Sequence, residues 1–509
     1  MTGRIFLFLG FPWPLAAQAQ VDSLALHYAE TITETDLREY LTELSSDAYE
    51  GRETGLHGQK KAMDYLQTKF GSFGIGPIQR TSPHVNGYLQ PFNLVIEQPG
   101  TMSLNIGGKA YKYLEDVLYF SSRITTSVEF QQVVLTSAGG VADVPQGTRA
   151  ILVLAPTKGA GDEAMNEQRA LGQAAAAQGV ELVLYCTDGF QTMKDRYAHW
   201  LGGTRTRLAE DVDQGTKKQT QTMVVTPAVA EGIMANVGRS FKREWARVQR
   251  GKRIKRKALV SSLGVVVEPK ATTATGENVL AYIPGSDKKE ELVIITAHYD
   301  HIGAHDGEVY NGADDDGSGT VALLEMAQAF AWARAEGHGP RRSMLFMPVS
   351  GEEKGLLGSE YYSEHPVFPI AQTVADLNID MIGRVDSAHA SSGPYVYIIG
   401  SDRLSTELHR INDAANKTYT QLDLDQAFNA HDDPNRFYFR SDHYNFARKG
   451  IPVIFYFSGV HEDYHQPTDE VEKIRFDLLR QRALLVFHTA WILANREDRI
   501  VVDGQVEKD

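Results

Sequence analysis

The sequence predicts an α/β protein: a mixed, largely parallel sheet sandwiched by helices, with a smaller accessory domain inserted into it. Two observations predict this class. Apolar runs typical of buried strands alternate with helical patterns through the second half of the chain. Acids and histidines stand where several of these runs end. Because open α/β sheets bind ligands at the carboxyl ends of their strands, these side chains should meet at one site.

The 509 residues exceed one ordinary domain, for which roughly 100 to 200 residues is the usual size. The hydrophobic content of 42% is sufficient for substantial cores. The expected divisions are a signal peptide over 1–20, a first part of a catalytic domain over 21–115, an inserted domain over 116–265 and the second part of the catalytic domain over 266–509.

The first 20 residues are typical of a secretory signal peptide, which predicts a secreted or periplasmic protein. They contain one arginine, an apolar stretch and small residues before Ala19. Pro12 and Pro14, with the short apolar length, argue against a membrane-spanning helix. No later segment reaches the roughly 18 apolar residues that such a helix needs, so we expect no stable membrane insertion. Cys186 is the only cysteine, which excludes an intramolecular disulfide.

The net charge of −14, from 51 basic and 65 acidic side chains, argues against a general nucleic-acid binder. The segment Lys242–Lys257 is basic against this acidic background. We interpret it as a solvated helix face and linker at the end of the inserted domain, with a polyanion-binding surface as the alternative.

Helices are expected near the N-terminus. Residues 33–47 begin at Thr33, a suitable N-cap, and residues 60–70 carry apolar positions at helical spacing. Residues 81–115 are mixed and rich in turn formers. In the expected insertion, residues 131–140 and 149–157 predict strands, and the alanine-rich stretch 167–189 predicts a helix that leads into another strand.

The second catalytic part begins with two expected strands, over 276–286 and 291–300, separated by a Pro-Gly turn. A long helix follows, capped near Ser318 and ending near Gly337. Strand and helix then alternate over 342–350, 359–365, 373–380 and 477–495. This alternation is what predicts a sheet covered by helices on both faces.

A dispersed set of five side chains suits two divalent cations; it consists of His298, Asp315, Glu353, Asp380 and His465. Imidazole together with carboxylate favours zinc, whereas an all-oxygen set would favour magnesium or calcium. If Asp315 bridges, the other four divide into one imidazole and one carboxylate per ion, and positions stay open for water and substrate. Any one of these residues alone would be interpreted as a solvated acid or a core histidine.

Glu352 needs a separate role, because adjacent residues at a strand end point in different directions. We predict that it is the general base, which takes the proton from the water that attacks the substrate.

Five motifs together resemble those of the co-catalytic di-zinc exopeptidases, the family of bacterial leucyl aminopeptidases and glutamate carboxypeptidase. They are AHYDHIG, NGADDDGSG, SGEEKGLLGSEYY, NIDMIGR and DYHQPTD. The resemblance extends over about 35–80 and 270–490, and the texture of the expected insertion resembles a protease-associated domain. This resemblance implies a mixed, largely parallel sheet sandwiched by helices, of the zinc-exopeptidase type.

The resemblance implies that His298 and Asp380 bind one zinc, Glu353 and His465 the second, and that Asp315 bridges them. Asp315 is chosen over Asp314 because the family's bridging aspartate stands three residues before Ser-Gly. A cis peptide bond after Asp315 is also implied.

Two residues beside the expected ligands have implied supporting roles. Asp300 resembles the carboxylate that orients the His298 imidazole. Tyr464 resembles a tyrosine that donates to the tetrahedral oxyanion, and a tyrosine packing on the core is the alternative. The loops 301–312 and 421–446 are expected to shape the substrate cleft, with Asp442 and His443 as positioning or wall residues.

These inferences predict a secreted or periplasmic aminopeptidase with two zinc ions per chain and peptide substrates. A carboxypeptidase or dipeptidase of the same family is the nearest alternative and would need substrate-facing arginines, for which Arg384, Arg436 and Arg440 are candidates. A glutaminyl cyclase, with a single zinc, is another. A non-catalytic binding module on the same scaffold would have lost ligands or the base.

Overall fold

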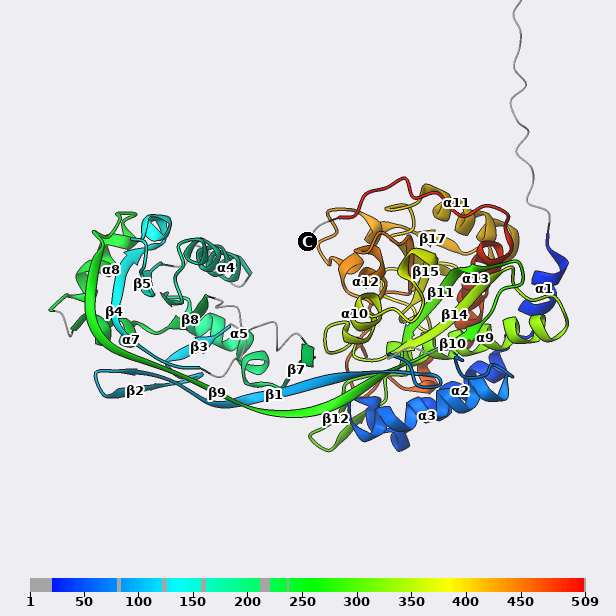
Figure 1. Cartoon of the computed structure of the whole chain (residues 1–509), viewed down its shortest axis with the longest axis horizontal. Helices are drawn as coiled ribbons and strands as arrows, with labels where there is room; N and C mark the ends of the chain where they lie inside the picture. Colours follow the sequence, from blue (N-terminus) through cyan, green and yellow to red (C-terminus); the bar gives the residue numbers. More distant parts are fainter. Residues whose placement is uncertain are drawn as a thin grey trace, which may run out of the picture. The chain divides into compact units, whose positions relative to one another are not determined.

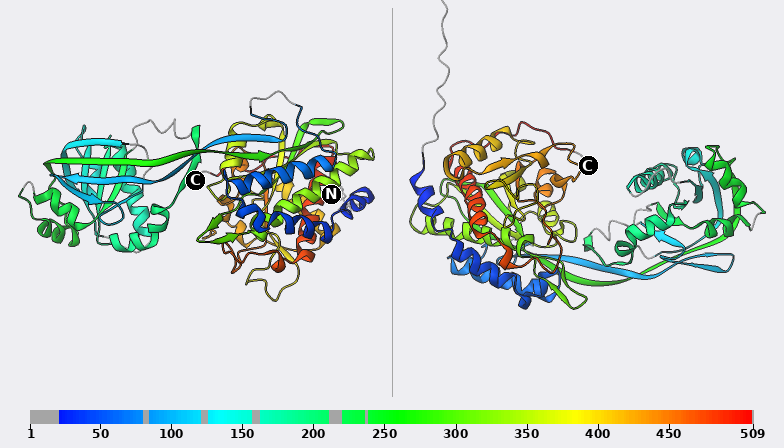
Figure 2. Two further views of the ribbon diagram at one scale, coloured as in Figure 1. Left: turned by 90° about the horizontal axis from the view of Figure 1, so that it is seen from below. Right: turned by 180° about the vertical axis from the view of Figure 1, so that it is seen from behind.

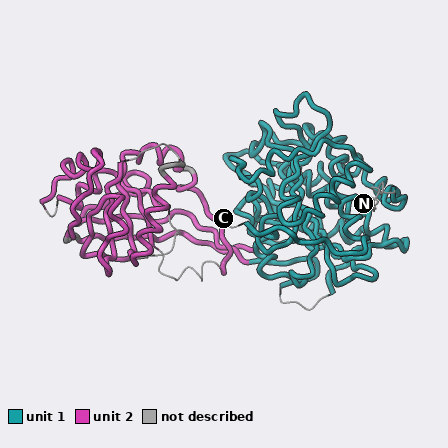
Figure 3. Tube along the Cα trace, turned by 90° about the horizontal axis from the view of Figure 1, so that it is seen from above, with its two compact units in different colours: residues 1–92, 276–509 teal, residues 93–275 magenta. Residues whose placement is uncertain are grey.

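The computed structural model describes residues 21–79, 84–120, 126–156, 162–210, 220–235 and 238–507. The chain forms two compact units (Figure 3): Met1–Phe92 with Gly276–Asp509, and Asn93–Thr275. The inserted unit therefore begins and ends outside the expected 116–265. Two long strands cross the boundaries between the units: β1 (Leu89–Ile106) crosses the first and β9 (Lys257–Val279) crosses the second. The segment expected to be rich in turns, 81–115, contains β1. The expected signal peptide lies outside the described residues.

The first unit contains the helices and strands expected for the catalytic part, together with further helices and strands that the sequence analysis did not predict. Its helices are α1 (Ser23–Ala29), α2 (Glu34–Leu44), α3 (His57–Ser72), α9 (Gly319–Ala335), α10 (Leu357–Glu364), α11 (Thr406–Ala415), α12 (His443–Ala447) and α13 (Phe476–Asn495). Its strands are β10 (Ala281–Ile283), β11 (Lys288–His298), β12 (Gly303–His305), β13 (Glu308–Tyr310), β14 (Arg342–Val349), β15 (Thr373–Ile379), β16 (Tyr395–Ile399), β17 (Asp423–Asp425) and β18 (Val453–Phe457).

Seven of these strands form one sheet in the order β10-β14-β11-β15-β18-β16-β17. The central strands β14, β11, β15 and β18 are parallel, whereas β10 and β16 pair antiparallel with their inner neighbours. The sheet is thus mixed and largely parallel, as predicted.

Helices cover both faces of this sheet (Figures 1 and 2). Alternate residues of β11 enter different cores, because side chains of a strand point to opposite faces in turn. Val293 and Ile295 pack with residues of α2, α9 and α13, and Leu292 and Ile294 pack with residues of α10 and α12. Burial on both faces explains why the second half of β11 is a continuous apolar run.

The expected helix starts are partly confirmed. Thr33 caps α2, and its Oγ1 accepts from the N–H of Asp36 at 3.1 Å. The helix α9 begins where expected, but Ser318 makes no side-chain cap. Asp316 takes that role, because its Oδ1 accepts from the N–H of Gly319 at 2.9 Å. The sequence did not reveal this cap, because it does not show which of three consecutive aspartates faces the helix start.

The second unit has its own sheet and core. Its sheet runs β2-β1-β9-β4-β5-β6-β8-β3, with β7 paired to β1. Besides β1 and β9, the strands are β2 (Lys109–Lys112), β3 (Val117–Tyr119), β4 (Thr126–Ser137), β5 (Ala150–Leu154), β6 (Leu182–Cys186), β7 (Arg205–Leu208) and β8 (Gln221–Val225). The helices are α4 (Asp162–Ala177), α5 (Phe190–Gly202), α7 (Pro227–Ala235) and α8 (Phe241–Gln249).

The basic segment Lys242–Lys257 forms most of α8 and the connection to β9, with most of its cations exposed. This agrees with a solvated helix and linker. Within the described ranges, no helix has the length and apolar character needed to cross a bilayer.

Candidate metal centre

The predicted ligands follow neighbouring strands of the first unit's sheet. His298 is the last residue of β11 and pairs with Val349, the last residue of β14. Asp380 directly follows β15, and Glu352 and Glu353 lie just beyond β14. The parallel order β14-β11-β15-β18 brings the carboxyl ends of these strands to the same edge, so residues distant in the sequence meet there.

Asp315 lies between the two predicted histidine ligands with one carboxylate oxygen toward each. Its Oδ1 lies 3.2 Å from Nε2 of His298, and its Oδ2 lies 3.1 Å from Nε2 of His465. The side chain is buried. A carboxylate held in this way can bridge two cations.

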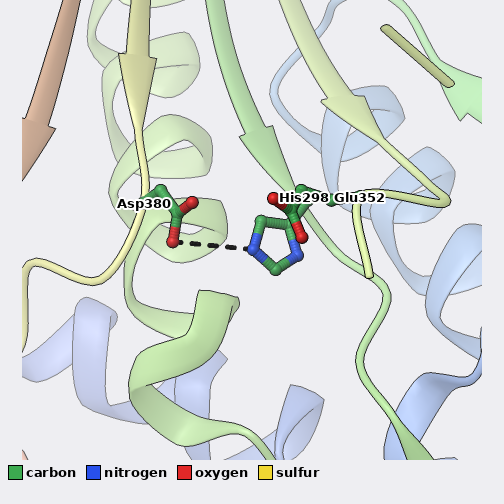
Figure 4. Close-up of side chains that lie close together, drawn as sticks. All are labelled: His298, Glu352 and Asp380. Carbon is green, nitrogen blue, oxygen red and sulfur yellow. Dashed lines mark ion pairs between the residues drawn. The ribbon is translucent and has the colours of Figure 1, made fainter. Parts of the chain in front are cut away.

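A first group of ligand atoms gathers at His298 (Figure 4). His298, Glu352 and Asp380 each place a ligand atom within 4.8 Å of the others. Nε2 of His298 lies 3.6 Å from Oδ1 of Asp380, whose Oδ2 accepts from the Ser441 hydroxyl at 2.7 Å. Glu352 was predicted as a base and not as a ligand. Its position in the first group is compatible with a base that reaches water at this point.

A second group gathers at Glu353. Oε2 of Glu353 lies 3.1 Å from Nε2 of His465. Its other oxygen, Oε1, lies 2.9 Å from Nδ1 of His301. His301, Asp315 and Glu353 have ligand atoms within 4.8 Å of one another. His301 was not among the predicted site residues, although it stands only three residues after His298 in AHYDHIG.

The three consecutive aspartates have different partners. Oδ1 of Asp314 accepts from the N–H of Gly383 at 2.6 Å, and Oδ2 of Asp316 accepts from the N–H of His298 at 3.2 Å. Only the carboxylate of Asp315 faces both histidines. The geometry therefore favours Asp315 over Asp314 as the bridge. The peptide bond between Asp315 and Asp316 is cis, as the resemblance implied.

Asp300 holds the imidazole of His298, but through its backbone. Nδ1 of His298 lies 3.1 Å from the carbonyl oxygen of Asp300 and 3.8 Å from its Oδ1. The carboxylate instead accepts from the hydroxyl of Thr54 at 2.7 Å and from the N–H of Glu352 at 3.3 Å. The expected carboxylate contact to the ring is replaced because the chain turns after β11 and presents the carbonyl to Nδ1.

Asp469 and His461 contact Asp314 and Asp315, and the sequence analysis did not predict either as a site residue. Oδ2 of Asp469 accepts from the backbone N–H groups of Asp314 and Asp315 at 3.0 and 3.1 Å. Nε2 of His461 lies 3.2 Å from Oδ2 of Asp314. Both residues lie in the same stretch as His465, but spacing alone does not show which of its acids and histidines turn inward.

The electrostatics of the centre favour cations. Burial alone would lower the pKa of His298, but the charges of Asp380 and Glu352 raise it well above its ordinary value. Burial also lowers the pKa of His465, but the carboxylates of Asp315 and Glu353 beside its Nε2 outweigh this effect and raise the pKa to about 10. The same negative field that holds protons on these two rings would hold divalent cations between them.

The donor set fits zinc. It combines two imidazoles with carboxylates, which is typical of catalytic zinc sites and not of magnesium or calcium sites. Oδ2 of Asp315, Oε1 of Glu353 and Nε2 of His465 are buried and have no hydrogen-bond partner in the part of the chain that the structure describes. Buried polar atoms without partners are costly, and coordination to a cation would satisfy them. The side chain of His465 is 36% exposed whereas that of His298 is 1% exposed, so the centre opens to solvent at His465.

A cleft with an apolar wall adjoins the centre. Asp315, Glu352 and Asp380 form its polar side together with Tyr464. The remaining lining residues are Met381, Phe437, Arg440, Phe455, Phe457 and Val460. The loop 421–446 thus contributes to the cleft as expected, through Phe437 and Arg440. The loop 301–312 contributes His301 to the second group but no lining residue to this cleft.

Asp442 and His443 are buried and form no wall. The Asp442 carboxylate accepts from the Ser359 hydroxyl at 2.5 Å, and the His443 ring stacks on Phe455 with centroids 4.8 Å apart. Burial lowers the pKa of His443 to about 3, so the ring is neutral. Of the two roles predicted for these residues, the geometry supports positioning.

Comparison with known proteins gives a family match for part of the chain. Residues 278–490 match the model of peptidase family M28. This part of the chain is similar to peptidase family M28. The matched range contains every predicted ligand and the predicted base, so the resemblance inferred from the five motifs is confirmed. For the inserted unit, the protease-associated domain stays a prediction.

Two curated relatives of the M28 part are named as aminopeptidases. Aminopeptidase YwaD of Bacillus subtilis is 29% identical over 238 residues, which are 45% of this chain and 47% of the relative. A probable leucine aminopeptidase of Arthroderma otae is 30% identical over 224 residues, 43% of this chain and 57% of the relative. The chain spans about half the length of the curated relatives it matches.

A solved structure shows the same fold. The aminopeptidase from Aneurinibacillus sp. strain AM-1 aligns with a TM-score of 0.55 and 20% sequence identity, covering 94% of this chain and 98% of that one. This likeness confirms the predicted fold class.

Proposed function

We propose that the protein is a secreted or periplasmic zinc aminopeptidase that removes N-terminal residues from peptides. The observation that carries the proposal is the position of Asp315, with one oxygen toward the histidine of each ligand group, His298 and His465, and with Glu352 in the first group. A structural metal site would need neither two groups joined by a carboxylate nor an acid at the cleft. The M28 match and the aminopeptidase relatives support the reaction class.

In this proposal two zinc ions are bound by His298 and Asp380, by Glu353 and His465, and by Asp315 in common. When bound, zinc supplies Lewis acidity at the scissile carbonyl and lowers the pKa of water at the site. Every further step belongs to side chains of this chain.

Glu352 acts as the general base in the proposal. Its carboxylate takes a proton from the attacking water and later gives it to the leaving amine. Burial raises the pKa of Glu352 well above its ordinary value; the charge of His298 opposes this, and Asp380 and Glu353 add to it. A carboxyl group with a raised pKa retains a transferred proton long enough to pass it on.

Tyr464 donates to the oxyanion in the proposal. Its ring stacks on His465 with centroids 3.9 Å apart, and the residue lines the cleft. Burial raises the pKa of the phenol, and the negative charges of Asp315 and Glu353 raise it further. The hydroxyl therefore stays protonated and can donate at any physiological pH.

The carboxylates around the centre explain why the proposed enzyme trims chain ends. A free substrate amine is a cation and would be attracted to Glu352 and Asp380, whereas an internal peptide bond offers no such charge. The wall formed by Met381, Phe455 and Phe457 suits an apolar first side chain.

The alternatives of the same family need features that the described site offers only in part. Arg384 is paired with Asp463 at 2.9 Å, and Arg436 lines a different pocket. Of the three candidate arginines only Arg440 lines the cleft, so a carboxypeptidase or dipeptidase would have one guanidinium for its substrate carboxylate. A glutaminyl cyclase needs a single zinc, and a binding module needs no base. The presence of two ligand groups argues against a single-zinc cyclase, and the presence of Glu352 argues against a binding module.

The test combines zinc content with hydrolysis of aminoacyl chromogenic substrates, before and after chelation, in wild type and Glu352→Gln. We expect two zinc ions per chain, release of N-terminal residues that chelation stops, and a fall in kcat of about 10²- to 10⁴-fold in Glu352→Gln with zinc retained. The exposed Glu308→Gln serves as control and should keep full activity.

Four results would redirect the assignment. One or no zinc per chain argues against the two-metal mechanism. Cleavage only of substrates with a free carboxyl terminus identifies a carboxypeptidase, and turnover only of an N-terminal glutamine identifies a cyclase. Full activity in Glu352→Gln shows that the base is another residue.

A further inference from the structure

Four buried polar side chains form a continuous series of contacts that ends on the proposed ligand Asp380. Thr296 lies on β11, Asp376 and Asn378 lie on β15, and Ser441 lies just before α12. All four are at most 1% exposed. Side chains two residues apart on a strand point to the same face, so Asp376 and Asn378 both reach Thr296 on the neighbouring strand.

Each step of this series has hydrogen-bond distance. Oγ1 of Thr296 lies 3.0 Å from Oδ1 of Asp376 and 2.7 Å from Oδ1 of Asn378. Nδ2 of Asn378 lies 2.8 Å from Oγ of Ser441. The hydroxyl of Ser441 in turn lies 2.7 Å from Oδ2 of Asp380. The series therefore joins an acid in the interior of the sheet to a carboxylate of the metal centre.

The number of available protons fixes the direction of the hydrogen bonds. A carboxylate that binds a cation is ionised and can only accept, so Ser441 gives its one proton to Asp380. The Ser441 oxygen then accepts from the amide N–H of Asn378, which turns the amide oxygen of Asn378 toward Thr296. Thr296 donates its one proton to that oxygen. The remaining contact, between Thr296 and Asp376, therefore needs a proton from Asp376.

The surroundings of Asp376 favour a neutral carboxylic acid. Its neighbours on the adjacent strands, Ile294 and Val453, belong to an apolar core. Oδ2 of Asp376 is buried and has no hydrogen-bond partner among the described residues, which costs less for a neutral acid than for a carboxylate. Burial raises the pKa of Asp376 well above its ordinary value; the Thr296 hydroxyl opposes this, and the charge of Asp442 adds to it.

We propose that Asp376 is a positioning residue for the first cation: as a neutral acid it donates to Thr296 and fixes the direction of a hydrogen-bond chain that ends on Oδ2 of Asp380. The donor on Oδ2 leaves Oδ1, which lies 3.6 Å from Nε2 of His298, for the cation. The inference rests on the proposed function, because it concerns the cation bound by His298 and Asp380.

The opposite direction of the chain is the competing state. If Asp376 were ionised, Thr296 would donate to it, and the amide of Asn378 would turn over to donate to Thr296. Ser441 would then donate to the amide oxygen. No proton would remain between Ser441 and Oδ2 of Asp380, and two acceptors 2.7 Å apart repel each other. Ionisation of Asp376 would therefore disturb the ligand at the other end of the chain.

Infrared spectroscopy of the zinc-loaded full chain at neutral pH tests the protonation of Asp376. The spectrum of wild type minus that of Asp376→Asn should contain the C=O stretching band of a carboxylic acid, which deuterium exchange shifts. Glu325→Gln supplies a reference band, because burial raises the pKa of Glu325 to about 8. A difference spectrum that shows only carboxylate bands for Asp376 would overturn the proposal.

Zinc titration of the chelator-stripped full chain tests the positioning role. In Asp376→Leu the affinity for one zinc ion should fall about 10-fold while the other is unchanged. Asp376→Asn should stay near wild type, because its amide N–H can donate to Thr296. Thr296→Val should lose at least as much as Asp376→Leu, and the double variant should lose no more than Thr296→Val alone, since both residues act through the same chain.

The control for the titration is Glu325→Gln, which replaces another buried acid and should bind zinc as wild type does. Circular dichroism and the thermal transition of each zinc-free variant establish that it is folded. Unchanged affinity in Asp376→Leu, or an equal loss in Asp376→Asn, would contradict the proposal. Additive losses in the double variant would also overturn it, because Asp376 and Thr296 would then act by separate routes.

A measurement on the unmodified protein covers the case in which the variants do not fold. Neutron diffraction from deuterium-exchanged crystals of the zinc-loaded wild type should show a deuteron on Oδ1 of Asp376 and the deuteron of Thr296 directed at Asn378. A Thr296 deuteron directed at a bare Asp376 carboxylate would overturn the proposal. Failure of the proposed function has a different signature: wild type would then bind fewer than two zinc ions, whatever the direction of the chain.

Discussion

Oδ1 of Asp300 accepts a hydrogen bond from the backbone N–H of Glu352 at 3.3 Å. Asp300 follows β11 and Glu352 follows β14, so the turn after one strand positions the proposed base after the other. The second oxygen of Asp300 accepts from the hydroxyl of Thr54 at 2.7 Å, and the carboxylate is fully buried. The carbonyl of the same residue lies 3.1 Å from Nδ1 of His298. One residue thus positions a proposed ligand through its backbone and the proposed base through its side chain.

This arrangement predicts that Asp300→Ala lowers kcat without releasing zinc. The variant keeps the carbonyl that orients His298 but loses the acceptor for Glu352, and a misplaced base typically costs about 10- to 100-fold. Steady-state kinetics and zinc analysis of Asp300→Ala and Asp300→Asn check it. Asparagine keeps an acceptor oxygen and should restore part of the rate.

Loss of zinc in Asp300→Ala would contradict this account, because it would mean that the carboxylate orients the imidazole, as the sequence suggested. Thr54→Ser, which preserves the hydroxyl donor to Asp300, is the matched control and should behave as wild type.

Tyr464→Phe is predicted to lower kcat by about 10²- to 10³-fold with little change in KM, the typical effect of removing one oxyanion donor. The residue lines the cleft beside the proposed base, so its hydroxyl can meet substrate. The stacked ring on His465 remains in the variant. Kinetics with an aminoacyl anilide, together with zinc content, provide the measurement.

A structural role for Tyr464 would give another pattern. If the residue only packs on the core, Tyr464→Phe should keep kcat, and Tyr464→Ala should lower the thermal transition temperature. A rate loss accompanied by zinc loss would indicate that the tyrosine supports His465 instead of the substrate.

The sheet and the meeting of the candidate ligands at one edge could be predicted because their signals are local. Each central strand is buried on both faces, which produces an uninterrupted apolar run, and an acid or histidine directly after such a run is seldom there for packing alone. The long strand β1 was missed because Pro91, Gly100 and several polar residues interrupt its pattern. Two of its partners, β9 and β7, lie about a hundred residues or more away in the chain, and only the short β2 is close.

The supporting residues could not be predicted because their roles depend on tertiary contacts. Arg52 donates to carbonyls about 250 residues further along the chain, and nothing in its local sequence distinguishes it from a solvated arginine. His301 follows His298 closely, but only the turn after β11 brings its ring to Glu353. Asp469 acts on backbone N–H groups, which every residue except proline offers equally.

Glu325 is a buried acid of α9 that anchors the start of α2. Its Oε2 accepts from the N–H of Thr33 at 3.0 Å, and its Oε1 has no partner within the described ranges. The residue is 1% exposed, and burial raises its pKa to about 8. The folded protein therefore keeps this carboxyl group protonated at pH values at which the unfolded chain has released the proton.

The sign of the pH dependence follows from this difference. Below about pH 4.5 both states bind the proton, and Glu325 adds no pH dependence. Between about pH 4.5 and 8 the unfolded chain binds fewer protons than the folded one, so the free energy of unfolding falls as the pH rises, by at most about 1.4 kcal/mol per pH unit. Above pH 8 the loss is complete.

Glu325→Gln should remove this loss, because glutamine stays neutral and still offers an oxygen to Thr33. We expect the variant to match wild type near pH 4.5 and to exceed it by about 2 to 4 kcal/mol at pH 8. Urea unfolding at four pH values measures the difference, with the exposed Glu39→Gln as control. A difference between Glu325→Gln and wild type that is the same at every pH would contradict the raised pKa. It would then show that the substitution acts through packing, since a packing effect carries no proton with it.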